Sequence, residues 1–407
     1  MSNPRKANVS VQYNGKNVTT KLTDYLSSFS YTDVASGESD SITFKLSNID
    51  KRWITTWLPV KGDKIIANII TQNWSKDGDK KTFKCGSFTI DDLSFSGPQL
   101  SGNIGAVSIP AMESFKATER TKTWKSVTIE SIAIEIAKRS KIKLIYTAGN
   151  IKINSIEQSN QTDCSFLYEL CESYGLAMKV YSDKIVIFDE STYENKKSVV
   201  TIKASELLTW NYNTKLTRTY TGAEIKYTNA STDKDIKIKV GTGNRILKIN
   251  EKADNLKDAE LKAMAKVNNA NKKMTTMKIT IKANTKIVAS SNIRISGLGK
   301  LDGKYAVDKV THTIGTGYTM KLDLRLIQNR IGDNTGKTST SGGTEYTIVR
   351  GDTLWDLSKK HLGSGENYMQ IYNANKEIIE AAAKKHGLTN SSNGYYIYPG
   401  TKIIIPS

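Results

Sequence analysis

Residues 332–344 form a run of glycine, serine, threonine, asparagine and charged side chains with no apolar residue. Such a segment has nothing to bury and behaves as a flexible linker. The chain therefore cannot fold around one core. It must form a large body before this run and a small body, residues 345–407, after it.

The chain has 407 residues and a formal net charge of +19. Only seven basic and six acidic residues follow residue 344, so nearly all of the excess lies in the large body. Nucleic-acid binding is one interpretation of this charge. The lysines, however, alternate with apolar residues in runs such as KDIKIKV and MKITIK, which is typical of the solvated face of strands. We expect no specific nucleic-acid partner.

No run of about 18 apolar residues is present, so we expect no membrane span. The first residues, MSNPRKANVSVQYNGK, lack the apolar stretch of a secretory signal, which predicts folding in the cytoplasm.

Strand and helix patterns divide the large body into three parts. Alternation of Ile42, Phe44 and Leu46 with polar residues predicts short antiparallel strands and a first small β-barrel over 1–115. Helical spacing in WKSVTIESIAIEIAKRS, including Val127, predicts the first helix of an α+β insert over 116–190. Its second helix starts at a Thr162 or Asp163 N-cap.

Strands return over 191–331 and predict a second β-barrel. One helix interrupts them from Asp254 to about Asn269, with Leu256, Ala259, Ala263 and Val267 on one face. The predicted fold class is mainly β with an α+β insert.

No catalytic or cofactor-binding motif is present, and we expect no enzymatic activity, no cofactor and no metal. The three histidines are scattered along the chain. Cys164 and Cys171 lie seven residues apart on a predicted helix, too far for a disulfide, and Cys85 fits a strand interior. The cysteines are expected to be free, buried thiols.

The small body shows a β, α, α, β order. Thr353 and Asp356 have capping-box spacing at the start of a helix. Pro399 and Gly400 fit the centre of a type II turn before a strand of isoleucines. Trp355, Leu354 and the isoleucines are candidates for its core.

The run EYTIVRGDTLW, a later IYNAN and IYPGTKIIIP resemble a LysM domain over 345–407, with one departure, the extra helical stretch KEIIEAAAKKHGLTNSSNG. The resemblance implies binding of N-acetylglucosamine glycans, peptidoglycan or chitin, in a shallow groove between two loops. A protein-docking role is the alternative. The groove residues carried onto this chain are Gly351, Asp352, Thr353, Leu354, Ile397, Tyr398 and Pro399.

Four segments of the large body stand out, in this order: SITFKLSNIDKRWITTWLPVKGDKI, CGSFTIDDLSFSGP, IGAVSIPAMESFKATERTKTWKSVTIESIAIEIAKRSKIKLIY and GKYAVDKVTHTIGTGYTMKLDLRLI. Together they resemble the baseplate hub family of contractile phage tails, also called late control protein D. The resemblance implies a homotrimer whose six barrels join the tail tube protein to the trimeric spike protein, next to other baseplate proteins.

The leading hypothesis is therefore a structural hub of a phage or a phage-tail-like bacteriocin, assembled in the bacterial cytoplasm, with a tethered wall-binding or docking domain. The second hypothesis is a peptidoglycan hydrolase, because LysM domains accompany such enzymes. A nucleic-acid-binding protein is the third and rests on charge alone.

Overall fold

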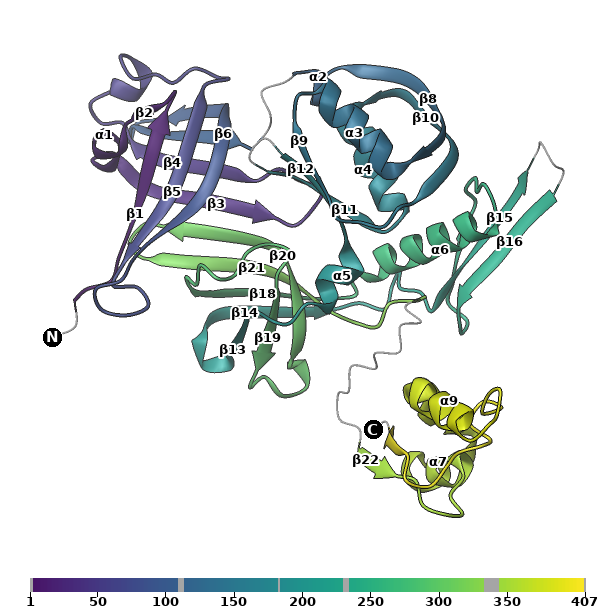
Figure 1. The fold of residues 1–407 in the computed structure, drawn as a ribbon. Helices are drawn as coiled ribbons and strands as arrows, with labels where there is room; N and C mark the ends of the chain where they lie inside the picture. The colour runs from purple at the N-terminus through teal and green to yellow at the C-terminus, as the bar shows by residue number, and fades with distance from the viewer. Residues whose placement is uncertain (1–2, 109–112, 182–183, 230–233, 333–343, 406–407) are drawn as a thin grey trace. The chain divides into compact units, whose positions relative to one another are not determined.

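The computed structural model describes residues 3–108, 113–181, 184–229, 234–332 and 344–405 (Figure 1). The chain separates into two compact units, residues 1–331 and 332–407. The division falls at the run that the sequence predicts to be a linker, of which 333–343 lie outside the described residues. Among the described helices, none combines the length and apolar character needed to span a bilayer.

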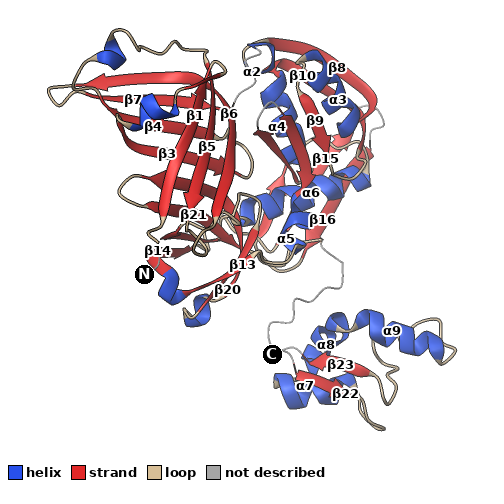
Figure 2. Ribbon diagram, turned by 60° about the vertical axis from the view of Figure 1, so that its left-hand side comes forward, coloured by secondary structure: helices blue, strands red, loops and turns tan. Residues whose placement is uncertain are grey.

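A 13-stranded sheet dominates the large unit and confirms a mainly β fold (Figure 2). Strands of the two predicted barrels meet where β3 pairs antiparallel with β20, for example Thr32 opposite Thr311. Among the described strands the pairings close neither half into a ring, because this junction makes both halves one continuous sheet. The strands are β1 (Lys6–Tyr13), β2 (Lys16–Asn17), β3 (Leu26–Val34), β4 (Ser41–Ser47), β5 (Lys64–Gln72), β6 (Lys80–Ser96), β7 (Ser101–Val107), β13 (Val200–Lys203), β14 (Leu207–Thr214), β18 (Thr275–Lys282), β19 (Asn292–Ser296), β20 (Gly303–Ile314) and β21 (Tyr318–Leu326).

Short helices lie in the connections of this sheet. They are α1 (Thr19–Thr23), η1 (Arg52–Ile54), η2 (Ala204–Glu206) and η3 (Gly299–Leu301).

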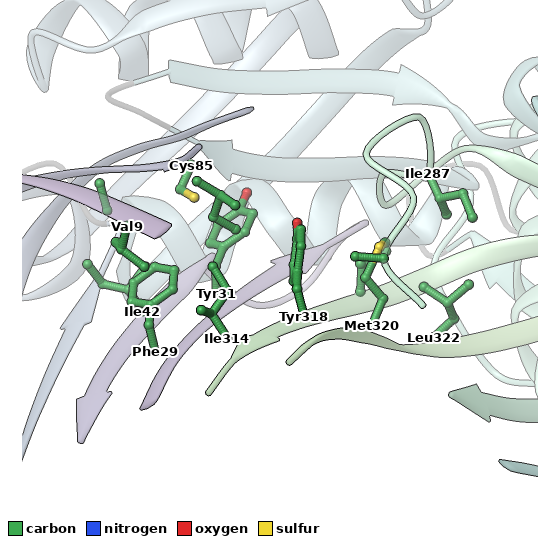
Figure 3. Packing of buried hydrophobic residues seen from close by; sticks show 14 of the residues in the cluster. Val9, Phe29, Tyr31, Ile42, Cys85, Ile287, Ile314, Tyr318, Met320 and Leu322 are labelled. Atoms are coloured by element: carbon green, nitrogen blue, oxygen red, sulfur yellow. The ribbon is translucent and has the colours of Figure 1, made fainter. Parts of the chain in front are cut away.

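One hydrophobic core serves both halves of the sheet. Ile42, Phe44 and Leu46 are buried, as the alternation along β4 predicts. Figure 3 shows Phe29 and Ile42 from the first half in the same cluster as Met320 and Leu322 from the second. The two halves therefore cannot unfold independently without exposing shared apolar surface.

The α+β insert has its own core and two small sheets, β8 with β10 and β11 with β12 and β9. Its first helix begins at Ile129, later than predicted, because Val127 pairs with Ile153 in a ribbon. Thr162, rather than Asp163, caps the second helix by accepting the Ser165 N–H. The elements are α2 (Glu113–Lys116), β8 (Glu119–Thr128), α3 (Ile129–Arg139), β9 (Lys143–Tyr146), β10 (Lys152–Thr162), α4 (Asp163–Ser173), β11 (Leu176–Tyr181), β12 (Lys184–Asp189) and α5 (Glu190–Asn195).

A further small sheet lies beside the long helix α6 (Leu256–Asn271) and consists of β15 (Gly222–Asn229), β16 (Lys234–Gly241) and β17 (Ile246–Ile249). Ala259, Ala263 and Val267 of α6 are buried in a core shared with this sheet. Leu256, expected on the same apolar face, is exposed. The helix that interrupts the second set of strands therefore covers its own small sheet.

Lysines of this small sheet at positions 226, 237, 239 and 248 are exposed. Lys226 is directly opposite Lys237 in the register, and both are exposed. Ala223 and Ile225, at alternate positions of the same strand, are fully buried. At these positions the alternation of lysine with apolar residues marks a solvated strand face.

A buried ionic cluster joins α5 to the end of the large unit. Arg330 Nε donates to Glu194 Oε2 at 2.6 Å, and its Nη2 donates to Glu190 Oε2 at 3.0 Å. Arg325 of β21 also pairs with Glu194, and Lys272 Nζ lies 2.6 Å from Glu190 Oε2. Because both glutamates are at most 9% exposed, these cations provide the compensation that a buried carboxylate requires.

The last described residues of the large unit are held to α6 by a reciprocal pair of hydrogen bonds. Ile331 N–H donates to Asn268 Oδ1, and Asn268 Nδ2 donates to the Ile331 carbonyl, both at 2.9 Å. Together with the Arg330 ion pairs, these bonds fix the point at which the chain leaves the unit.

The small unit has the predicted β, α, α, β order with one further helix. Strand β22 pairs antiparallel with β23, and Ile348, Leu357, Ile371, Ile379 and Ile403 form its core. The predicted extra helical stretch is α9. The elements are β22 (Thr344–Thr347), α7 (Leu354–Leu362), η4 (Gly365–Asn367), α8 (Tyr368–Ala374), α9 (Lys376–Lys385) and β23 (Lys402–Ile405).

Candidate functional site

Two loops of the small unit, residues 349–353 and 390–401, meet at the ends of its two strands. Ile348 N–H donates to the Thr401 carbonyl at 2.9 Å, and Gly400 N–H donates to the Ile348 carbonyl at 2.7 Å. Thr401 N–H closes a turn onto the Tyr398 carbonyl, with Gly400 at a φ of 84°. This positive φ is the conformation that a type II turn requires at its third residue and that glycine adopts without strain.

Asp352 organises the first loop. Its Oδ2 accepts the Val349 N–H at 2.8 Å and the Tyr346 phenol at 3.0 Å. Thr353 then caps α7, because its hydroxyl accepts the Asp356 N–H at 3.0 Å. The loop is consequently held by side chains on both sides of its exposed tip, Gly351.

Backbone donors remain free on both loops. Of the described residues, none accepts a hydrogen bond from the backbone N–H of Gly351 or Thr353 in the first loop, or of Ile397 or Tyr398 in the second. An uncharged carbonyl group, such as that of an acetamide, is a suitable acceptor for such donors.

The structure places six of the seven predicted groove residues at the surface. Gly351, Thr353 and Pro399 are exposed, and Asp352, Ile397 and Tyr398 are half-buried. Leu354 is only 2% exposed and contributes to the core, so its side chain lies beneath the loops. The two sets of residues belong to neighbouring loops, and glycan contact by any of them remains a prediction.

The second loop is supported by residues that the sequence did not indicate. Glu380 of α9 accepts the Ser391 N–H at 3.0 Å and the Tyr372 phenol at 2.8 Å. Hydrogen bonds from Ser391 and Tyr372 lower the pKa of the Glu380 carboxyl. The backbone at Gly394 lies against Leu354, where a Cβ atom would come within 2.4 Å of the leucine side chain. The added helix is thus part of the loop's support.

Trp355 does not lie in the core, where the sequence had placed it. Its side chain is 49% exposed and covers Gly365, with the ring centroid 5.9 Å from that of Tyr368. Because Leu354 and Leu357 occupy the inward face of α7, Trp355 is directed to the surface.

The large unit shows no reactive thiol or metal centre within its described residues. Burial raises the pKa of the Cys171 thiol to about 12, and burial also raises the pKa of Cys85 and Cys164. These values disfavour the thiolate that a nucleophile needs. Across the described ranges, no group of three or more His, Cys, Asp or Glu side chains is placed to bind a metal ion.

His312 is buried in the shared core rather than in a cleft. Its Nδ1 lies 2.7 Å from the Tyr318 phenol, and its ring stacks on Tyr31. Burial lowers the pKa of His312 to about 4. The imidazole is therefore neutral at physiological pH and acts as a packed aromatic side chain.

Comparison with family models matches the LysM domain over residues 346–381. The small unit carries a LysM domain. The matched residues include the first loop and most of α9, whereas the second loop of the candidate groove lies beyond them.

The chain is also homologous to phage baseplate hub proteins. It is 25% identical over 175 residues to the probable baseplate hub protein of Escherichia phage 186 and 28% identical over 177 residues to that of Escherichia phage P2. Each match covers 42% of this chain and 42% of the relative. A 68-residue match, 35% identical, links it to the uncharacterized protein YqbP of Bacillus subtilis (strain 168), covering 17% of this chain and 30% of the relative. The chain thus spans less than half the length of these relatives.

Solved tail proteins share its fold. The 43 kDa tail protein of prophage MuSo2 from Shewanella oneidensis superposes with a TM-score of 0.62 over 78% of this chain and 98% of that protein, at 14% identity. The tail protein from Neisseria meningitidis MC58 gives a TM-score of 0.60 over 78% of this chain and 96% of that protein, also at 14% identity. The predicted baseplate hub and LysM resemblances are both confirmed.

Proposed function

We propose that this protein is the structural hub of a contractile phage tail or a phage-tail-like bacteriocin, where it joins the tail tube to the spike as a homotrimer. The homology to probable baseplate hub proteins carries this proposal. The tail-protein fold supports it, and so does the sheet that unites the two halves around one core, a rigid design for a load-bearing part. The protein acts in the baseplate of the particle, after assembly in the bacterial cytoplasm, and without enzymatic activity.

The LysM domain of this hub binds peptidoglycan glycan between its two adjoining loops. Free N–H groups on both loops donate hydrogen bonds to the acetamide carbonyl of N-acetylglucosamine, and apolar atoms of Ile397 and Pro399 lie against the sugar. Docking to another baseplate protein is the alternative use of the same domain. The half-exposed Trp355 beside Tyr368 favours it, because aromatic side chains are common anchors of protein interfaces.

Retention on insoluble peptidoglycan distinguishes these uses of the LysM domain. The full chain should be retained, whereas a variant ending at Asn334 should remain in solution, and chitin serves as a second matrix. Supernatants should contain no released muropeptides, since release would favour a hydrolase. If neither protein is retained, glycan binding is wrong and the domain is a docking module.

The mass of the purified chain in solution tests the trimer. Light scattering should give about three times the mass of one chain, or, after mixing with tube or spike protein, the mass of a complex that contains three copies of the chain. A chain that stays monomeric in every mixture would contradict the hub assembly.

A further inference from the structure

The helix added to the LysM domain carries an aromatic side chain to the second groove loop. His386, directly after α9, stacks on Tyr398 with ring centroids 3.9 Å apart and planes only 7° from parallel. Tyr398 is one of the predicted groove residues, while His386 belongs to the stretch in which this chain departs from the LysM pattern.

The backbone of His386 is fixed at the end of α9, while its side chain is exposed apart from the ring stack. Its backbone N–H donates to the carbonyls of Ala382 and Ala383 at 3.2 and 3.1 Å. The Leu388 N–H also donates to the Ala383 carbonyl, at 3.0 Å. The helix itself is fixed to the core by Ile379, which is 1% exposed. Asn375, the residue just before the helix, exchanges two hydrogen bonds with the backbone of Ile404 in β23.

The backbone of Tyr398 is also fixed, but its phenol hydroxyl is left without a partner among the described residues. The turn at Pro399 and Gly400 fixes its backbone, because Thr401 N–H donates to the Tyr398 carbonyl at 3.2 Å. Throughout the described residues, its phenol oxygen has no hydrogen-bond partner. The Tyr398 side chain is half-buried, with one ring face covered and a free hydroxyl. Aromatic side chains that combine an apolar ring with a solvent-accessible polar group are common in binding sites.

We propose that the added helix is part of the glycan site, with His386 as the positioning residue that holds Tyr398 so that its phenol hydrogen-bonds a sugar hydroxyl. This inference rests on the proposed glycan binding. It adds a side-chain contact to the backbone contacts proposed for the acetamide. The imidazole itself covers the far face of the Tyr398 ring and need not touch the sugar.

The stack fixes an orientation that an isolated tyrosine would have to adopt on binding. Ordering a free side chain in a complex costs affinity, so a preformed ring binds more tightly than a mobile one. The same reasoning predicts that any flat aromatic ring at position 386 will serve, because the imidazole is used for stacking rather than for a hydrogen bond.

Titration calorimetry of the full chain with chitopentaose, a soluble pentamer of N-acetylglucosamine, tests this role. His386→Ala should weaken binding about tenfold, since both the covered face and the fixed orientation are lost. His386→Phe should retain affinity close to that of the wild type. Tyr398→Phe, which keeps the stack and removes only the hydroxyl, should lose roughly fivefold, the value of one hydrogen bond.

Lys385→Ala is the matched control, because Lys385 is an exposed neighbour whose side chain forms no hydrogen bond or ion pair with any described residue. Equal affinities for His386→Ala and the wild type, or wild-type affinity of Tyr398→Phe, would overturn the inference while leaving glycan binding intact. A wild-type chain that binds neither chitopentaose nor peptidoglycan would overturn both proposals. Should His386→Ala lose its fold by circular dichroism, the two phenylalanine variants still decide the outcome.

Discussion

Replacing Glu194 by alanine should lower the free energy of unfolding of the large unit by about 3–5 kcal/mol. The carboxylate is only 7% exposed and pairs with both Arg325 and Arg330. Its removal leaves two buried guanidinium groups short of a partner, which is costlier than losing the same contact in water. Burial alone would raise the pKa of Glu194, but the two arginines outweigh it and hold the pKa below its usual value.

Urea denaturation of the wild type and variant, monitored by the fluorescence of the tryptophans, would measure this loss. Glu224→Ala is the matched control, because Glu224 is only half-buried and pairs at 4.0 Å with Lys237, whose side chain is exposed. Exposed pairs contribute at most about 1 kcal/mol, so the control should unfold nearly as the wild type does. Equal effects of the two substitutions would show that the buried cluster adds nothing to stability.

Acidification from pH 7 to pH 4 should cost the wild type about 3 kcal/mol more stability than it costs a His312→Phe variant. Burial lowers the pKa of His312 to about 4, below the ordinary value near 6.5 that it has when unfolded. Between these values the unfolded chain binds a proton that the folded chain does not. The contribution of His312 is therefore complete above pH 6.5 and is lost as the pH falls toward 4.

Comparing the two proteins is essential, because a nearby carboxyl group titrates in the opposite sense. Burial raises the pKa of Asp40 to about 6, despite its contact with Lys179, so the folded chain binds that proton more tightly. This contribution strengthens the fold as the pH falls through 6, and it is common to wild type and variant. Parallel stability curves for the two proteins over pH 4–7 would show that His312 is not the group responsible.

Local patterns in the sequence predicted much of the fold. The alternation of apolar and polar residues correctly predicts the buried face of β4. Thr162, which caps α4, is one of the two N-cap residues that the sequence predicts for this helix. The helix predicted to contain Val127 starts later, because a ribbon with β10 competes for those residues and no local pattern reveals that partner. The pairing of β3 with β20 joins residues nearly 280 positions apart, beyond the reach of periodicity.

The candidate groove was also predicted only in part, because it depends on contacts between residues that are distant in the sequence. A motif identifies Gly351 and Pro399 by their neighbours in sequence, and the structure brings their loops together. The exposure of Trp355 follows from which face of α7 the leucines occupy, and apolar character alone does not distinguish the two faces. His386 lies in a stretch without a motif, and its contact with Tyr398 depends on where α9 ends.

The fixed exit of the chain from the large unit has a mechanical consequence. Tension on the linker would first load the hydrogen bonds between Ile331 and Asn268, and then the ion pairs of Arg330. Beyond Arg330 the force passes into α5 and α6 as well as along the backbone toward β21, so it does not act on β21 alone. If the proposed hub recoils while its LysM domain is bound to the wall, several elements of the large unit would share that load.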